Sequence, residues 1–299
     1  MAFAVRWWLA LALAAQIVAP ATASAASALL LSQQEPPQVR VNVAVQSEGP
    51  FAEEASHDSA YRAALEEVNS GGGFAALQRH VPALTEAFSH APGTYPTVQE
   101  VAGGWSIRAD TRDEIMTLAQ RIGEVQSERG GGEVKVVARP NVYPNIAFLL
   151  ASAAVERRDF ATAHAVLDAG LALQPLDRHL LNEKLVVLHA ERRWEEAYLL
   201  VKNALATDDP LLKADPALLQ RRLGYTLVEL GRLHEARAAY EASLEAEPGN
   251  AIALAELEFI TNAEQGQPNY GEMQILAPNM PVATSKPESQ TQVQERKAN

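Results

Sequence analysis

One helical hairpin pattern occurs three times in this chain of 299 residues. The last copy reads "LGYTLVELGRLHEARAAYEASLEAEPGN", residues 223–250, where a glycine separates two apolar-striped segments and a proline follows the second. One alanine returns in every copy, with 34 residues between Ala163 and Ala197 and 39 between Ala197 and Ala236. We place the additional residues in "PLLKAD", residues 210–215. A single hairpin cannot bury its apolar face, so the repetition predicts a stack of neighbouring hairpins.

The spacing inside each copy indicates how two helices can pack closely. Each repeated alanine is followed four residues later, on the same helix face, by a larger apolar residue: Leu167, Val201 and Tyr240. The small residue lets the paired helix approach, and the larger one fills the space beside it. A proline then stops the second segment of each copy and turns the chain: Pro175, Pro210 and Pro248.

The period and three stretches of the last copy resemble the tetratricopeptide repeat family. These stretches are "LGYTL" in the first helix, "GRLHEA" at the turn and "AEPGN" at the exit. The resemblance covers residues 144–262 and implies a mainly α fold: an α-α superhelix of about three hairpins, with residues 251–262 as a capping helix. The first two copies depart from the pattern. Neither has the turn glycine, and the leucine-glycine pair is Leu150-Ala151 in one and Lys184-Leu185 in the other.

In this family the first helix of each hairpin lines a concave groove, so the resemblance implies a site for a protein or peptide partner. The alternative is that some of these side chains pack on the preceding domain or on the capping helix. The implied groove residues are Asn145, Phe148, Ser152, Val155, His179, Asn182, Val186, His189, Leu218, Arg221, Tyr225 and Val228.

One function of the family is set aside on the identity of the groove residues. Members that grip the C-terminal carboxylates of chaperones do so with lysines, arginines and asparagines. Two of the corresponding residues here are acids, which would repel a carboxylate. The six positions hold Ser152, Val186, Tyr225, Glu156, Ala190 and Glu229.

Residues 38–140 have a different pattern, which predicts a small split α+β domain. A strand with alternating valines (39–45) precedes two amphipathic helical stretches, the second of which contains Pro82, expected to bend or interrupt it. A hairpin around Gly103-Gly104, a helix opened by the capping-box pair Thr111 and Glu114, and a strand at 133–138 follow. The alternative is an all-helical arrangement in which residues 58–90 join the repeats as degenerate hairpins.

Both ends of the chain are expected to lie outside the folded part. Arg6 is followed by an apolar run from Trp7 to Ala15 and then by small residues, the pattern of a signal peptide, which we assign to residues 1–25 with a linker at 26–37. The mature chain would begin near Ser24, Ala26 or Leu29. The alternative is a membrane anchor, but the run is shorter than the ~20 residues that span a bilayer. The tail, residues 263–299, is rich in proline and glutamine and is expected to be disordered.

Composition and motifs argue against several classes of function. A net charge of −12 repels nucleic acid and anionic lipid, and the lack of cysteine excludes disulfides, thiol catalysis and a lipid-anchored cysteine. The glycine clusters 71–73 and 130–132 lack the residues of a phosphate loop and are interpreted as turns. His57-Asp58-Ser59 has the residue types of a hydrolase triad, but adjacent residues cannot form one. No catalytic constellation, cofactor site or metal site is predicted.

The sequence therefore predicts a non-enzymatic scaffold, exported to the periplasm or secreted, that binds a protein or peptide partner in its groove. The alternative is a ligand-binding, cell-wall-binding or enzymatic domain at residues 38–140, with the repeats as a targeting arm. The identity of the partner, the pathway and the oligomeric state do not follow from the sequence.

Overall fold

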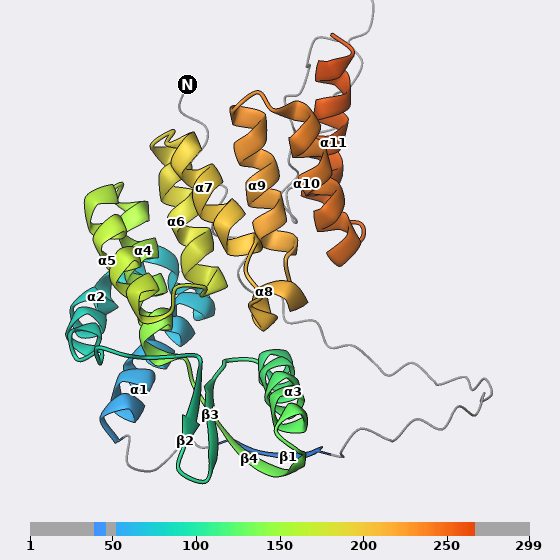
Figure 1. The fold of residues 1–299 in the computed structure, drawn as a ribbon. Helices are drawn as coiled ribbons and strands as arrows, with labels where there is room; N and C mark the ends of the chain where they lie inside the picture. The colour runs from blue at the N-terminus through green and yellow to red at the C-terminus, as the bar shows by residue number, and fades with distance from the viewer. Residues whose placement is uncertain (1–38, 46–51, 267–299) are drawn as a thin grey trace, which may run out of the picture.

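The computed structural model describes residues 39–45 and 52–266. The predicted signal peptide, the linker and residues 267–299 of the predicted tail lie outside this description. Most of the described chain forms a curved stack of helices, and a sheet with one covering helix lies below this stack in the view of Figure 1. The helices, in chain order, are α1 (Ala52–Glu67), the π-helix η1 (Val68–Gly72), α2 (Gly73–Ser89), α3 (Arg112–Glu128), α4 (Val142–Glu156), α5 (Phe160–Leu173), α6 (Arg178–Ala190), α7 (Trp194–Leu205), α8 (Pro210–Ala214), α9 (Ala217–Glu229), α10 (Leu233–Ala246) and α11 (Ala251–Glu264).

The three repeated copies form the hairpins α4–α5, α6–α7 and α9–α10, and α11 follows them. Their repeated alanines, Ala163, Ala197 and Ala236, have no exposed surface. The larger apolar residues four positions later are buried as well. In the last hairpin Gly224 faces the Tyr240 ring so closely that an added Cβ would lie 2.7 Å from it. The predicted fold class, an α-α superhelix of hairpins preceded by a small α+β region, is confirmed.

The turn between the two helices has the same left-handed conformation in all three hairpins. Gly231 has a φ of 72°, and the equivalent residues Arg158 and Arg192 both have a φ of 58°. The backbone hydrogen bonds of the turn recur too, since the Arg192 amide donates to the His189 carbonyl at 3.0 Å and the Gly231 amide to the Val228 carbonyl at 2.9 Å. The geometry of the turn is therefore kept in the two copies that lack the family's glycine.

The strands form one mixed sheet in the order β1-β4-β3-β2, in which β4 runs parallel to both β1 and β3 and β2 pairs antiparallel with β3. α3 lies across one face, with Leu118 and Ile122 in the core. The predicted capping box is present, since the Thr111 hydroxyl accepts from the Glu114 amide and the Glu114 carboxylate accepts from the Thr111 amide. The strands are β1 (Val39–Val45), β2 (Val98–Val101), β3 (Gly104–Arg108) and β4 (Gly132–Arg139).

α1 and α2 form a further helical hairpin, which packs on α4. Leu77 of α2 and Ile146 of α4 belong to one buried core. Gly71, with a φ of 103°, lies where the chain turns between the two helices, and α2 continues through Pro82 without ending there. The packing of α1 and α2 on α4 matches the alternative prediction, in which residues 58–90 join the helical stack. The predicted strands nevertheless form a sheet, as the α+β prediction has it. The boundaries of the predicted domains stay a prediction.

The residues inserted between the second and third copies form α8. Asp209 caps this short helix by accepting hydrogen bonds from the amides of Leu211 and Leu212. Leu211 packs against the core between α3 and the sheet. The insertion therefore ties the helical stack to the sheet.

Replacing Arg192 by glycine should stabilise the protein by about 0.5–1 kcal/mol. A left-handed conformation costs a residue with a Cβ atom roughly 1–2 kcal/mol, and the greater freedom of glycine in the unfolded chain offsets part of the gain. The Arg192 side chain is exposed, so little packing is lost. Urea unfolding measures the difference, and Gly231→Arg should lower stability by a similar amount. Equal stability of both variants and wild type would contradict this account of the turn.

Candidate functional site

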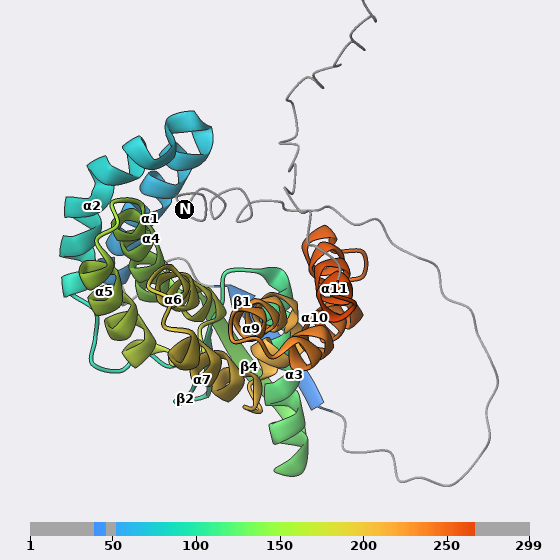
Figure 2. The same cartoon turned by 90° about the horizontal axis from the view of Figure 1, so that it is seen from above.

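The first helices of the hairpins lie on the inside of the curved stack. Figure 2 shows α4 and α6 on the inner side of the curve and α5 and α7 on the outer side. We call the inner face the side of α4, α6 and α9 that carries the twelve predicted groove residues, together with the matching side of α11.

The structure divides the twelve predicted residues into two groups. Ser152, Val186 and His189 are buried. The Arg221 side chain is only 13% exposed, and it donates to Ser243 of α10 at 3.2 Å and to Glu247, the residue after α10, at 2.5 Å. A partner can reach the other eight, whose role in binding stays a prediction. These eight are Asn145, Phe148, Val155, His179, Asn182, Leu218, Tyr225 and Val228.

Polar contacts connect the first helices to one another across the inner face. Ser152 Oγ donates to Glu183 Oε1 at 3.3 Å, which joins α4 to α6. Arg222 Nε donates to Asn182 Oδ1 at 2.7 Å, which joins α6 to α9. Sequence reasoning missed Glu183 and Arg222, although each directly follows a predicted groove residue, Asn182 or Arg221. That adjacency of polar residues is the signal that could have found them.

His189 lies in an aromatic cluster between α6 and α9. Its Nε2 is 2.8 Å from Thr226 Oγ1, which itself donates to the Arg222 carbonyl, so Nε2 is assigned the proton. Its Nδ1 is buried and has no hydrogen-bond partner. The ring centres of Tyr225 and Trp194 lie 5.0 and 5.5 Å from the imidazole. Burial, with a smaller effect of the Arg222 charge, lowers the pKa of His189 to about 3, so the imidazole is neutral.

The inner face continues onto α11, which sequence analysis treated only as a cap. In α6 and α9 the predicted groove positions lie one, four, eight and eleven residues after the first residue of the helix. The same offsets in α11 give Ile252, Ala255, Phe259 and Asn262. Ile252 is 46% exposed and Phe259 is 38% exposed. The offset from the helix start is the signal that would have found these residues.

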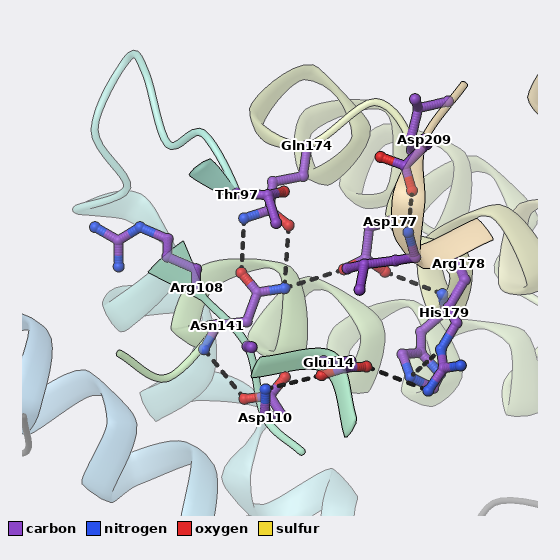
Figure 3. A pocket seen from close by; sticks show the side chains of 13 residues that line it. Thr97, Arg108, Asp110, Glu114, Asn141, Gln174, Asp177, Arg178, His179 and Asp209 are labelled. Carbon is purple, nitrogen blue, oxygen red and sulfur yellow. Dashed lines mark hydrogen bonds and ion pairs between the residues drawn. The ribbon is translucent and has the colours of Figure 1, made fainter. Parts of the chain in front are cut away.

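The first turns of α4 and α6 meet the sheet region in a polar junction (Figure 3). Two buried amides, Asn141 and Gln174, exchange hydrogen bonds of 3.1 and 2.7 Å there. Two predicted groove residues lie beside them: Asn145 donates to Asp110 at 2.8 Å, and His179 lines the cavity. The cavity of about 40 Å³ has room for a few waters and is far smaller than ordinary ligand pockets. The junction therefore holds the sheet against the helices.

The decisive observation is that one hairpin geometry, with its buried alanine and left-handed turn, recurs after 34 and then 39 residues and places the first helices on the inside. The helical part of this chain has the fold of a tetratricopeptide repeat array. No protein-family model and no curated protein matches the chain.

Solved structures of tetratricopeptide repeat proteins resemble the fold. Pseudomonas aeruginosa PilF is 13% identical, with 72% of each chain covered and a TM-score of 0.49. The first tetratricopeptide domain of Spaghetti (RPAP3), bound to an HSP90 peptide, is 21% identical over 41% of this chain and 93% of that one, with a TM-score of 0.37. TTC0263 of Thermus thermophilus is 16% identical over 69% and 98%, with a TM-score of 0.35. The bound peptide is a finding about the Spaghetti (RPAP3) domain alone.

The histidine, aspartate and serine at positions 57–59 lie on α1 and bond to separate partners. His57 Nδ1 is 3.1 Å from the Tyr143 hydroxyl, Asp58 pairs with Arg62 at 2.6 Å, and Ser59 donates to the Ala55 carbonyl. Across the described ranges no three His, Cys, Asp or Glu side chains are grouped so that they could hold a metal ion. None of the helices in the described part of the chain combines the length and apolar character needed to cross a membrane.

Two opposite charges lie partly buried between α6 and α9 of the tetratricopeptide array. Burial raises the pKa of Glu183 to about 7, against the opposing effects of the Arg222 charge and the Ser152 hydroxyl. Burial also lowers the pKa of Arg222, although a guanidinium stays protonated near neutral pH. The inner face therefore contains a carboxyl group that keeps its proton to a higher pH than an exposed glutamate does.

Glu183→Gln should stabilise the protein at pH 8 and leave its stability nearly unchanged at pH 4. The pKa of Glu183 is about 7 in the folded protein and has the ordinary value of 4.5 in the unfolded chain. As the pH rises, the unfolded chain therefore loses the Glu183 proton before the folded protein does. Wild type consequently loses stability between about pH 4.5 and pH 7. Glutamine cannot ionise, so the variant should be more stable by about 1–3 kcal/mol at pH 8. Urea unfolding at both pH values measures this difference.

Glu195→Gln is the control, because Glu195 is exposed on α7. It should change the free energy of unfolding by less than about 0.5 kcal/mol at either pH. If the stability of Glu183→Gln relative to wild type were the same at pH 4 and pH 8, the Glu183 carboxyl group would not be buried in the folded protein.

Proposed function

We propose that this protein is a non-enzymatic scaffold that binds a protein or peptide segment along the inner face of its tetratricopeptide array. The observation that carries the proposal is the continuous set of accessible side chains on successive first helices. Aromatic rings, an amide and aliphatic groups occur together there: Phe148, Asn182 and Tyr225 on α4, α6 and α9, followed by Ile252 and Phe259 on α11. Such a mixture suits an extended peptide or a partner helix.

The accessible apolar groups are concentrated toward the C-terminal end of the inner face. Ile252 and Phe259 are large and exposed on α11, whereas the accessible residues near the junction include the polar Asn145 and His179. Exposed apolar side chains that lie together commonly mark interaction sites. The proposed partner therefore places its apolar side chains against α9 and α11 and its polar groups nearer α4 and α6.

We also propose that the protein acts outside the cytoplasm, most simply in a periplasm. Support comes from the charged start, the short apolar run and the small residues at positions 21–28. N-terminal sequencing of the native protein tests this proposal: a start between Ser24 and Leu29 agrees with it, and an intact Met1 contradicts it.

Replacing both Ile252 and Phe259 by serine should weaken partner binding at least tenfold. Buried apolar anchors contribute roughly 1–2 kcal/mol or more each to an interface, and 1.4 kcal/mol corresponds to a factor of ten. Because both side chains are exposed in the free protein, the thermal unfolding curve should change little. The measurement is quantitative capture of partners from envelope extract by the mature chain and the variant, read by mass spectrometry.

Leu199→Ser is the matched control, because Leu199 is 54% exposed on α7, one of the outer helices. It should capture the same partners as wild type. Equal capture by the double variant would contradict the inner face as the binding surface. It would favour the alternative, in which a ligand-binding, cell-wall-binding or enzymatic site lies in residues 38–140.

A further inference from the structure

β1 is an edge strand that has no partner on its outer side among the described residues. It pairs with β4 on one side only and keeps seven residues in regular register. Natural edge strands are commonly shielded by proline, a bulge, short length or an inward-pointing charge. β1 contains no proline, and its alternate residues Val39, Val41, Val43 and Val45 all point to the face that α3 covers.

An open cleft of about 560 Å³ runs between β1 and α3. Val41 and Val43 line it from the strand, and Met116 and Ala119 line it from the helix. Val43 is 38% exposed, Val45 73% and Met116 57%, so α3 leaves this part of the sheet uncovered. Asp113, Thr117 and Gln120 of α3 also line the cleft. The unpaired strand edge and this partly apolar cleft therefore form one continuous surface.

We propose that this surface binds a second copy of the chain, with β1 pairing antiparallel to the partner's β1 to form an eight-stranded sheet. The strand is self-complementary about its central residue, Asn42. A two-fold axis at Asn42 sets Val41 opposite Val43 and Val39 opposite Val45, and no like charges face each other across it.

The position of α3 fits this arrangement. α3 packs on both β1 and β4 and therefore lies between them. Neighbouring strands lie about 4.8 Å apart, so the two-fold axis between the two β1 strands lies about 2.4 Å outside β1. The helix axis of α3, between β1 and β4, then lies about 5 Å from the two-fold axis. The helix axes of the two α3 copies therefore lie about 10 Å apart. Packed helices have axes about 8–10 Å apart. Each α3 would fill the other copy's cleft and cover its exposed Met116 and valines.

Light scattering after gel filtration tests the proposal on the chain without its predicted signal peptide, at about 10–100 μM. Wild type should have twice the mass of one chain. Val45→Lys with Met116→Lys should raise the dimer dissociation constant at least tenfold, because both positions are exposed and the lysines would be forced into the interface. Leu199→Lys, an exposed substitution on α7, should remain a dimer.

Cross-linking tests the register, because the chain has no cysteine of its own. Asn42→Cys should be joined to its symmetry mate by a short thiol cross-linker, and Arg40→Cys should react much less. A wild-type monomer would overturn the proposal, as would a lysine variant that remains dimeric or equal cross-linking at both positions. A monomer that dimerises only after residues before Val39 are removed would also overturn it, by showing that the chain's own N-terminal segment covers the edge.

Discussion

The close approach of paired helices at one alanine per hairpin determines the shape of the helical array. Ala163, Ala197 and Ala236 have no exposed surface, and each lies where a larger side chain would separate the two helices. Because every hairpin is packed in the same way, each new hairpin is added with the same rotation, and the stack curves. The curve places the first helices on one side and so creates the inner face.

The sheet is attached to this array by contacts at the ends of the helices and in the segments that connect them. The buried amides of Asn141 and Gln174 bond to each other, and Gln174 also donates to the carbonyl of Tyr95, which precedes β2. A buried amide without partners costs about 1–3 kcal/mol, so such a pair fixes the relative position of the two parts. Leu211 of α8, which lines the same junction cavity, adds an apolar contact with the core between α3 and the sheet. The inner face and the edge of β1 are thereby held as two separate surfaces of one body.

Periodicity predicted which side of each helix is apolar, but not which neighbour covers that side. The repeat period, the buried alanines and the Thr111 capping box follow from local sequence, and each agrees with the structure. The packing of α1–α2 on α4 depends on contacts between residues about 70 apart, which a helical pattern does not specify. Arg221 shows the same limit, because its position in α9 suited the groove while its guanidinium donates to Ser243 of α10. The left-handed turns at Arg158 and Arg192 carry no glycine that would have revealed them.

Thermal unfolding of Ala197→Glu tests the close helix contact most directly. A glutamate at this fully buried position would overpack the contact and bury an unpaired charge, at a cost of about 3 kcal/mol or more. Because stacking couples the hairpins, the transition of the whole array should fall by roughly 6–12 °C, while Ala238→Glu, at an exposed position of α10, should change it little. A melting temperature for Ala197→Glu within error of wild type would contradict the account.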